Sequence, residues 1–404
     1  MFRNNKISKG NKDKINSLLF TLFLFSDMLT FPLMMLTGSS VFFWIFMLLT
    51  LIVSTLLNKS INKTILMVFI CGTIIFMINV LLVDYKLDVL YIYMLFIRVG
   101  IFSLHFSSLI NDYKILIKYY YVLSIVSLLI SNIYLDYYEV TNRYMDLGIH
   151  LSQIFIGLAI YHYNVEFKYK IINYFLLLLV IIEILIFGNR SSLIICMVVL
   201  FYFELVNIKL NKKGVFIFLL KVNTAVISIF FLIFNINSLI ELLINFTMKL
   251  GIYSYSITKL KLTVQSGLFG IAEQSSGRDV LYPLIEDIII ESNFLPKGVG
   301  YLPFITNYHY VYPHNLFLEI ALDFGIIGLM GLILMVIFLW KKYFYISGKD
   351  KIFRDIVSAM VIYSFIRLMF SGSYWQEPLF WGSIGLIIFY SVNKYKDTIF
   401  VSRK

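Results

Sequence analysis

Three short polar motifs contain the residues of this chain that could do chemistry. They are Gly188–Ser192 (GNRSS) with Arg190, Ser276–Asp279 (SGRD) with Arg278, and Pro313–Asn315 (PHN) with His314. An arginine beside the free N–H groups at the start of a helix favours an anion, and its guanidinium can hold two phosphate oxygens at once. A histidine can act as a general base near neutral pH. These residues could therefore bind a phosphate and activate a hydroxyl group.

The motif at His314 leads into a helix whose polar residues share one face. Asn315, Glu319 and Asp323 are four residues apart, so they stack along one side of the helix. Polar groups inside a membrane span usually face a cavity or the interior of the bundle. A histidine followed by such a stripe indicates a functional site more strongly than a lone histidine does.

Each motif also has a structural interpretation. Arg190 could reach lipid headgroups from the membrane boundary, Arg278 could be a solvated arginine in a capped helix, and His314 could be a structural interfacial histidine. Six further ionisable residues lie within predicted spans, and for these we expect pairing between spans. They are Asp27, Arg98, His105, Glu183, Lys221 and Arg367.

The composition shows which elements must position these residues. Hydrophobic residues make up 60% of the 404, charged residues only 14%, and the mean hydropathy is +0.86. This is too apolar for a soluble domain, so we predict an all-α, polytopic bundle of about twelve transmembrane spans. The spans are predicted near 17–37, 40–57, 64–83, 89–110, 118–135, 147–163, 171–187, 191–208, 215–234, 314–340, 354–371 and 377–393. Three regions follow: a nine-span region at 1–234, a long polar loop at 235–313, and a three-span region at 314–404.

The distribution of Lys and Arg predicts the orientation of the spans. Most of them lie in the tail 1–16 and in alternate connections, whereas the other short connections hold few. By the positive-inside rule, both termini are cytoplasmic and the long loop is extracytoplasmic. The basic tail leads into a full-length span without a cleavage site, so we expect a cytoplasmic tail and not a cleaved signal. Arg190, Arg278 and His314 then share the outer side. Two cations and one base there suit a reaction on a lipid-linked pyrophosphate.

Within the long loop we expect short helices. Ser238–Leu250 carries Glu241, Asn245 and Lys249 on one face, a pattern typical of an interfacial helix. Tyr253–Ser276 is rich in Ser, Thr, Gly and Gln and is predicted as loop. Asp279–Glu291 is predicted as a second helix.

Several classes of function are excluded by what the sequence lacks. It has no P-loop, no dinucleotide glycine motif, no zinc-binding His-Glu-x-x-His and no Asp-x-Asp. Cys71 and Cys196 lie inside apolar runs, so neither a disulfide nor a thiolate metal site is expected. The net charge of +11 arises mainly from short connections, which argues against nucleic acid as a partner. We therefore predict no metal and no cofactor, and chemistry that uses a bond energised before it crossed the membrane.

The combination of motifs resembles the O-antigen ligase/polymerase superfamily. The resemblance rests on Gly298–Tyr301 (GVGY), Pro313–Asn315, the run Glu319–Gly328 with its DFGIIG, and the two arginine motifs upstream. It covers about 188–330. The turn Asn189–Ser192 contains fewer small residues than the family pattern.

The resemblance implies a metal-independent, inverting glycosyltransferase in the bacterial plasma (inner) membrane, acting on undecaprenyl-pyrophosphate-linked oligosaccharide. His314 would deprotonate the acceptor hydroxyl, and Arg190 and Arg278 would neutralise the departing pyrophosphate. Asn315, Glu319 and Tyr282 would bind substrate.

Among the members of this superfamily we favour a polymerase of O-antigen, capsule or a similar surface polysaccharide. Besides membrane lipids, a chain-length regulator is a candidate partner. A ligase that transfers the finished glycan, and a lipid-linked oligosaccharide flippase, are the alternatives.

Overall fold

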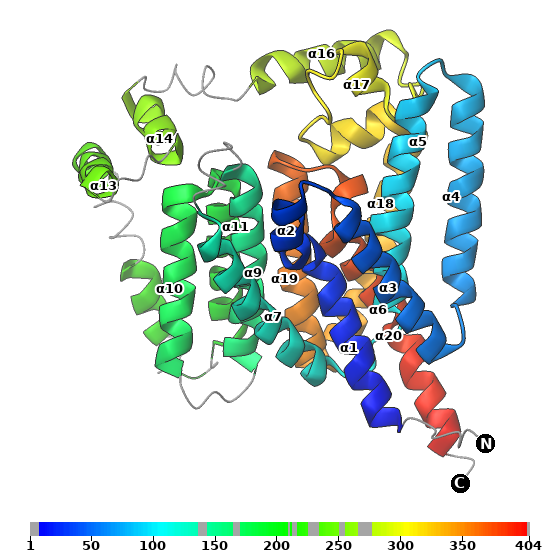
Figure 1. The fold of residues 1–404 in the computed structure, drawn as a ribbon, viewed down its shortest axis with the longest axis horizontal. Coiled ribbons are helices and arrows are strands. Elements are labelled where there is room, and N and C mark those ends of the chain that lie inside the picture. The colour runs from blue at the N-terminus through cyan, green and yellow to red at the C-terminus, as the bar shows by residue number, and fades with distance from the viewer. Residues whose placement is uncertain are drawn as a thin grey trace. The chain divides into compact units, whose positions relative to one another are not determined.

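The computed structural model describes residues 8–135, 144–164, 170–208, 211, 216–224, 234–249, 255–265 and 277–401, and within these ranges it is helical without a strand (Figure 1). Contacts divide the chain into two units. The larger unit comprises Met1–Ile130 and Leu281–Lys404, and the smaller comprises Ser131–Val280. The predicted division at 234 and 313 is one of membrane topology, and it stays a prediction.

The larger unit is organised around its last helix. Its elements are α1 (Lys9–Leu24), α2 (Ser26–Thr37), α3 (Val41–Asn58), α4 (Lys63–Leu82), α5 (Lys86–Leu95), the π-helix η1 (Phe96–Ile101), α6 (Phe102–Ser107), most of α7 (Tyr113–Ile133), most of α16 (Arg278–Glu291), α17 (Tyr301–Ile305), α18 (Leu316–Ser347), α19 (Lys351–Phe370), the 3-10 helix η2 (Tyr374–Gln376) and α20 (Pro378–Val401). The helix α20 packs against α6, α18, α19 and η1. The end of the chain therefore joins η1 and α6, from the N-terminal part, to α18 and α19, which follow the long loop.

The smaller unit is built around α9. It contains α9 (Tyr144–Asn164), α10 (Lys170–Phe187), α11 (Arg190–Val206), α13 (Ile236–Lys249) and α14 (Tyr255–Gln265). The helix α9 packs against both α10 and α11, and its residues Ile154, Phe155, Ile156 and Leu158, which point to different sides, are completely buried. Burial of apolar side chains on several sides of one helix makes α9 the core of this unit.

Among the residues that the structure describes, six helices are long and apolar enough to cross a membrane. They are α3, α4, the continuous run Lys86–Ser107 formed by α5, η1 and α6, then α7, α10 and α18. A seventh span is possible if α1 and α2, which are bent by 58° to one another, count as one. Large apolar side chains along α3, α4 and α18 are exposed, as expected for lipid-facing surfaces.

The all-helical class is thus confirmed, and the number of twelve spans stays a prediction. Helices also occupy the spans predicted near 147–163, 191–208, 354–371 and 377–393, but these helices are shorter or less apolar than the six. Most of the span predicted at 215–234 lies outside the described residues.

The long loop is more helical than its composition indicates. The helices predicted over Ser238–Leu250 and Asp279–Glu291 are present as α13 and α16. The prediction of loop over Tyr253–Ser276 was wrong for α14, which covers Tyr255–Gln265. The reason is tertiary packing: α14 contacts α10 and α13, and Ile257 is buried to 3% exposure, which offsets a weak intrinsic helix propensity.

The helix after His314 is broken at Gly325, where a continuous span was expected. Gly325 adopts φ 63° and ψ −156°, outside the helical region. The segment after α16 lies against this break: the N–H of Ile326 donates to the carbonyl of Phe294 at 3.0 Å, and the N–H of Lys297 donates to the carbonyl of Leu322 at 2.9 Å. A Cβ atom on Gly325 would lie 2.4 Å from the Phe294 oxygen, so only glycine fits here.

The break separates a short helix from the part of α18 that can cross the membrane. Residues 326–347 alone form a helix about 33 Å long at roughly 1.5 Å per residue, which matches a hydrocarbon core of about 30 Å. The preceding turns of α18, which carry Glu319 and Asp323, are therefore not needed for crossing and can form a site.

Replacing this glycine tests the constraint. In Gly325→Ala the side chain meets the Phe294 carbonyl and the backbone is held at positive φ, a conformation that costs roughly 1–3 kcal/mol outside glycine. We expect a fall of several degrees in melting temperature and a smaller monodisperse fraction by size-exclusion chromatography of the purified protein. Gly331→Ala on the same helix is the matched control, because a Cβ atom added there would have no neighbour within 4 Å. Equal melting curves for the two variants would refute the steric argument.

Candidate functional site

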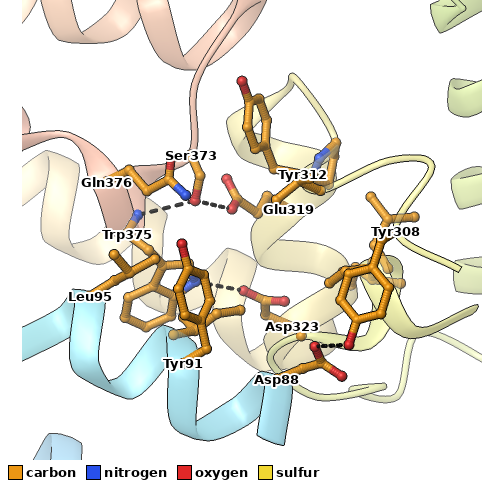
Figure 2. Close-up of a pocket in the computed structure, with 17 residues that line it drawn as sticks. Asp88, Tyr91, Leu95, Tyr308, Tyr312, Glu319, Asp323, Ser373, Trp375 and Gln376 are labelled. Carbon is orange, nitrogen blue, oxygen red and sulfur yellow. Dashed lines mark hydrogen bonds between the residues drawn. The ribbon is translucent and has the colours of Figure 1, made fainter. Parts of the chain in front are cut away.

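A cavity of about 90 Å³ lies in the larger unit, among α5, α17, α18, η2 and the segment before α18 (Figure 2). Its chemically distinctive lining consists of carboxylates, aromatic rings and two uncharged polar side chains. These are Asp88, Glu319 and Asp323; Tyr91, Tyr308, Tyr312 and Trp375; and Ser373 and Gln376. The cavity thus joins segments that are more than 280 residues apart in the chain.

Local capping sets where the elements around the cavity begin. Asn315 is the N-cap of α18, and its side-chain oxygen accepts from the N–H groups of Phe317 at 2.9 Å and Leu318 at 3.3 Å. Ser373 precedes η2 and accepts from the N–H of Trp375 at 3.2 Å. Such caps satisfy backbone donors that a helix start leaves without partners. Asn315, which we predicted to bind substrate, therefore already uses its oxygen to start the helix.

Glu319, on α18, is hydrogen-bonded to the connection between α19 and α20. It is 4% exposed and accepts a short hydrogen bond from the Ser373 hydroxyl through Oε1. The backbone amide of Tyr374 also interacts with this carboxyl group. Its second oxygen, Oε2, is buried without a hydrogen bond to any residue that the structure describes. A buried acceptor without a donor is costly, so this atom is ready to accept a hydrogen bond from a ligand.

Asp323 lies one turn further along α18 and is oriented by two donors. Its Oδ2 accepts from the Tyr374 hydroxyl at 2.8 Å and from the Trp375 indole N–H at 3.1 Å. In Figure 2, Glu319 and Asp323 both point from α18 toward the segment that holds Ser373 and Trp375. The prediction that these two carboxyl groups share one face is confirmed.

Two tyrosine hydroxyls at the site remain protonated donors at neutral pH. Burial raises the pKa of Tyr374 well above its ordinary value, and the carboxyl groups of Asp323 and Glu319 raise it further. The 2.8 Å hydrogen bond that Tyr308 donates to Asp88 raises the pKa of Tyr308. The donors therefore stay matched to their carboxyl acceptors across the physiological pH range.

His314 lies beside the cavity, next to Tyr312 and Pro313, which line it. Its backbone is left-handed, with φ 58°, a conformation uncommon outside glycine. Its ring lies 4.4 Å from the ring of Tyr312, measured between centroids, and its carbonyl accepts from the Tyr282 hydroxyl at 3.1 Å. The structure thus brings together Tyr282, His314 and Glu319, three of the residues predicted from sequence.

Arg190 and Arg278 lie in the smaller unit. Arg190 is exposed and is the first residue of α11, whose N-cap Asn189 accepts from the N–H of Ser192 at 2.8 Å. The predicted tight turn before a helix is therefore confirmed. Arg278 is the first residue of α16. The convergence of both arginines with His314 stays a prediction.

Among the other ionisable residues in predicted spans, pairing is the rule. Arg367 forms an ion pair with Glu377 at 2.9 Å and donates to the Tyr363 hydroxyl at 2.9 Å. Arg98 lies 5.0 Å from the ring centroid of Phe43, a cation–π contact. The remaining pairs are His105 with Ser54, Glu183 with Asn132, and Lys221 with Glu204. For these five residues this agrees with the pairing expected from sequence; Asp27 is exposed on α2, and its pairing stays a prediction.

No family model matches this chain, and no curated protein or solved structure matches it at a significant level. The resemblance to the O-antigen ligase/polymerase superfamily therefore stays a prediction. Within the described ranges, no three His, Cys, Asp or Glu residues are grouped so that they could hold a metal ion.

Sequence reasoning missed most of the cavity. Asp88 and Tyr91 sit in the first turns of α5, and Tyr308 lies in the segment before α18. The connection Ser371–Glu377 (SGSYWQE) supplies Ser373, Trp375 and Gln376. Its concentration of polar and aromatic residues between two apolar helices was the available signal.

Asp323 can be tested as the acceptor that holds this connection. Asp323→Ala leaves the Tyr374 hydroxyl and the Trp375 indole buried without their acceptor, at about 1–3 kcal/mol for each donor. We expect a clear fall in melting temperature and an altered emission from Trp375. Asp323→Asn keeps a carbonyl acceptor, so its melting temperature should fall less. Glu286→Gln, at an exposed carboxyl on α16, is the control; if Asp323→Ala melts with it, the assignment fails.

Proposed function

We propose that this chain is a membrane glycosyltransferase that polymerises undecaprenyl-pyrophosphate-linked oligosaccharide units into a surface polysaccharide at the outer face of the bacterial plasma membrane. The observation that carries the proposal is the grouping of Tyr282, His314 and the Glu319–Asp323 carboxyl pair beside one cavity. A candidate base next to a cavity that holds carboxyl groups suits the activation of a hydroxyl group.

The position of the cavity along its helices supports the outer face. It lies at the starts of α5 and α18 and at the connection between α19 and α20. The opposite ends of these helices lie near lysines: Lys114 and Lys118 in the first turns of α7, and Lys349 and Lys351 at the start of α19. With the positive-inside rule, the lysine-rich ends are cytoplasmic and the cavity is extracytoplasmic, in a twelve-span arrangement.

In the proposed reaction His314 takes the proton of an acceptor hydroxyl as that oxygen attacks the anomeric carbon of the donor sugar. The bond from this carbon to the pyrophosphate oxygen breaks with inversion, and the lipid pyrophosphate leaves with the electron pair. Arg190 and Arg278 would hold the pyrophosphate, whose charge grows as the bond breaks. Apart from the bond in the donor, this reaction needs neither a metal nor a cofactor.

Complementation of a strain that lacks this gene tests the proposal. Wild type should restore a ladder of surface polysaccharide on a gel. His314→Ala at matched membrane levels should leave a single repeat unit, because the acceptor hydroxyl is not deprotonated. His309→Ala is the matched control, since His309 is an exposed histidine of the same segment and does not line the cavity.

Two results would contradict the assignment. A full ladder from His314→Ala would remove the histidine from catalysis. The second result concerns the deletion strain. If full-length polymer accumulates there on its lipid carrier and reaches its final acceptor only when the gene is restored, the protein is a ligase instead.

Impermeant maleimide labelling tests the sidedness. In a background without Cys71 and Cys196, Val311→Cys should be labelled in intact cells because Val311 is 52% exposed beside the cavity. Lys349→Cys, at the opposite end of α18, should be labelled only after permeabilisation. The reverse pattern would overturn the topology and the outer-face chemistry together.

A further inference from the structure

The carboxyl groups in the cavity discriminate between the two chemical parts of a lipid-linked sugar substrate, the sugar and the pyrophosphate. The lining of the cavity contains the carboxyl groups of Asp88, Glu319 and Asp323, and among the described residues that line it none is Lys, Arg or His. A pyrophosphate carries several negative charges and offers acceptors, so it gains nothing from a lining of carboxyl groups. A sugar residue without a charged substituent offers hydroxyl donors in several directions.

The buried oxygen of Glu319 needs such a donor. Ser373 already occupies Oε1, whereas Oε2 is buried in the wall of the cavity without a hydrogen bond within the described part of the chain. A sugar hydroxyl at hydrogen-bond distance would satisfy this acceptor. An ionised phosphate oxygen is itself an acceptor, so it could not donate the hydrogen bond that Glu319 Oε2 lacks.

The aromatic lining fits the apolar face of a sugar ring. Tyr91 is 58% exposed and Tyr308 is 64% exposed although both line the cavity, so their rings are available to a ligand. The electron-rich face of an aromatic ring attracts the weakly positive C–H groups of a pyranose. The hydrogen bond from Tyr308 to Asp88 holds one of these rings in place. The volume of about 90 Å³ suits one end of a substrate and not a whole oligosaccharide.

We infer that this cavity is the subsite for one uncharged sugar residue, with Glu319 accepting a hydrogen bond from a sugar hydroxyl, and that pyrophosphate and acidic sugars are excluded from it. The inference rests on the proposed function for the identity of the whole substrate. The binding itself needs no turnover, so it can be measured independently.

Saturation-transfer-difference NMR on the full-length protein in lipid nanodiscs tests the inference. Nanodiscs are required because sugar-headgroup detergents would compete for the cavity. The probes are methyl β-glucoside, methyl β-galactoside and methyl β-N-acetylglucosaminide as neutral glycosides, methyl β-glucuronide as the acidic one, and methyl β-glucosaminide as the cationic one. We expect saturation transfer to at least one neutral glycoside and none to the glucuronide.

Two variants locate the signal. In Glu319→Gln the amide oxygen can keep the Ser373 hydrogen bond, which turns the NH₂ group toward the cavity and replaces the free acceptor by a donor. Tyr91→Ala removes an exposed ring, so the fold should survive even if the buried variant fails. We expect each to reduce transfer to the neutral glycoside at least threefold. Glu286→Gln, whose exposed carboxyl group lies outside the lining, should leave it unchanged.

Three results would overturn the inference. They are transfer to no neutral glycoside, transfer to the glucuronide or only to the glucosaminide, and transfer to a neutral glycoside that neither cavity variant reduces. The outcome is separable from that of the polymerase proposal. Neutral glycosides that bind while His314→Ala still gives a ladder would leave the subsite standing without that mechanism. A ladder that depends on His314 without glycoside binding would leave the mechanism standing without this subsite.

Discussion

At Gly325 the carbonyl of Phe294 lies where any other residue would place its Cβ atom, and the backbone of Ile326 donates to that carbonyl. This insertion breaks α18 and ties the end of the long loop to it. The turns before the break are not needed to cross a membrane, so they can present Glu319 and Asp323 to a cavity. The position of the candidate site therefore depends on one backbone contact that only glycine permits.

The connection between α19 and α20 completes the site through buried polar contacts. Ser373 donates to Glu319, and Tyr374 and Trp375 donate to Asp323, so each carboxyl group is oriented by this connection. The ion pair between Arg367, in α19, and Glu377 also ties the end of this connection to α19. Buried polar groups are tolerated when they are satisfied, and a satisfied network holds a single arrangement. One acceptor, Glu319 Oε2, has no donor among the described residues, and it lies where a ligand would bring one.

The proposed chemistry divides the charges of the chain between two tasks. The acidic and aromatic cavity suits an uncharged sugar, whereas the arginines at the starts of α11 and α16 suit phosphate because helix N-termini favour anions. A donor in which a sugar is joined to a pyrophosphate contains both parts. The cavity would recognise the sugar through the hydroxyl groups that the sugar donates, and the arginines would recognise the leaving group through its negative charge.

The sequence by itself determined the all-helical class with helices apolar enough to cross a membrane, the helices at 279–291 and 238–250, the turn that starts at Asn189, and the shared face of Glu319 and Asp323. These follow from hydropathy, helical period and capping, which act over a few residues. Only the tertiary structure decided the break at Gly325, the helix over Tyr255–Gln265, and the contribution of Asp88, Tyr308 and Ser373 to the cavity. Each of these depends on contacts between segments far apart in the chain. Local propensity carries no information about such contacts, so the carboxyl stripe could be predicted but the groups that surround it could not.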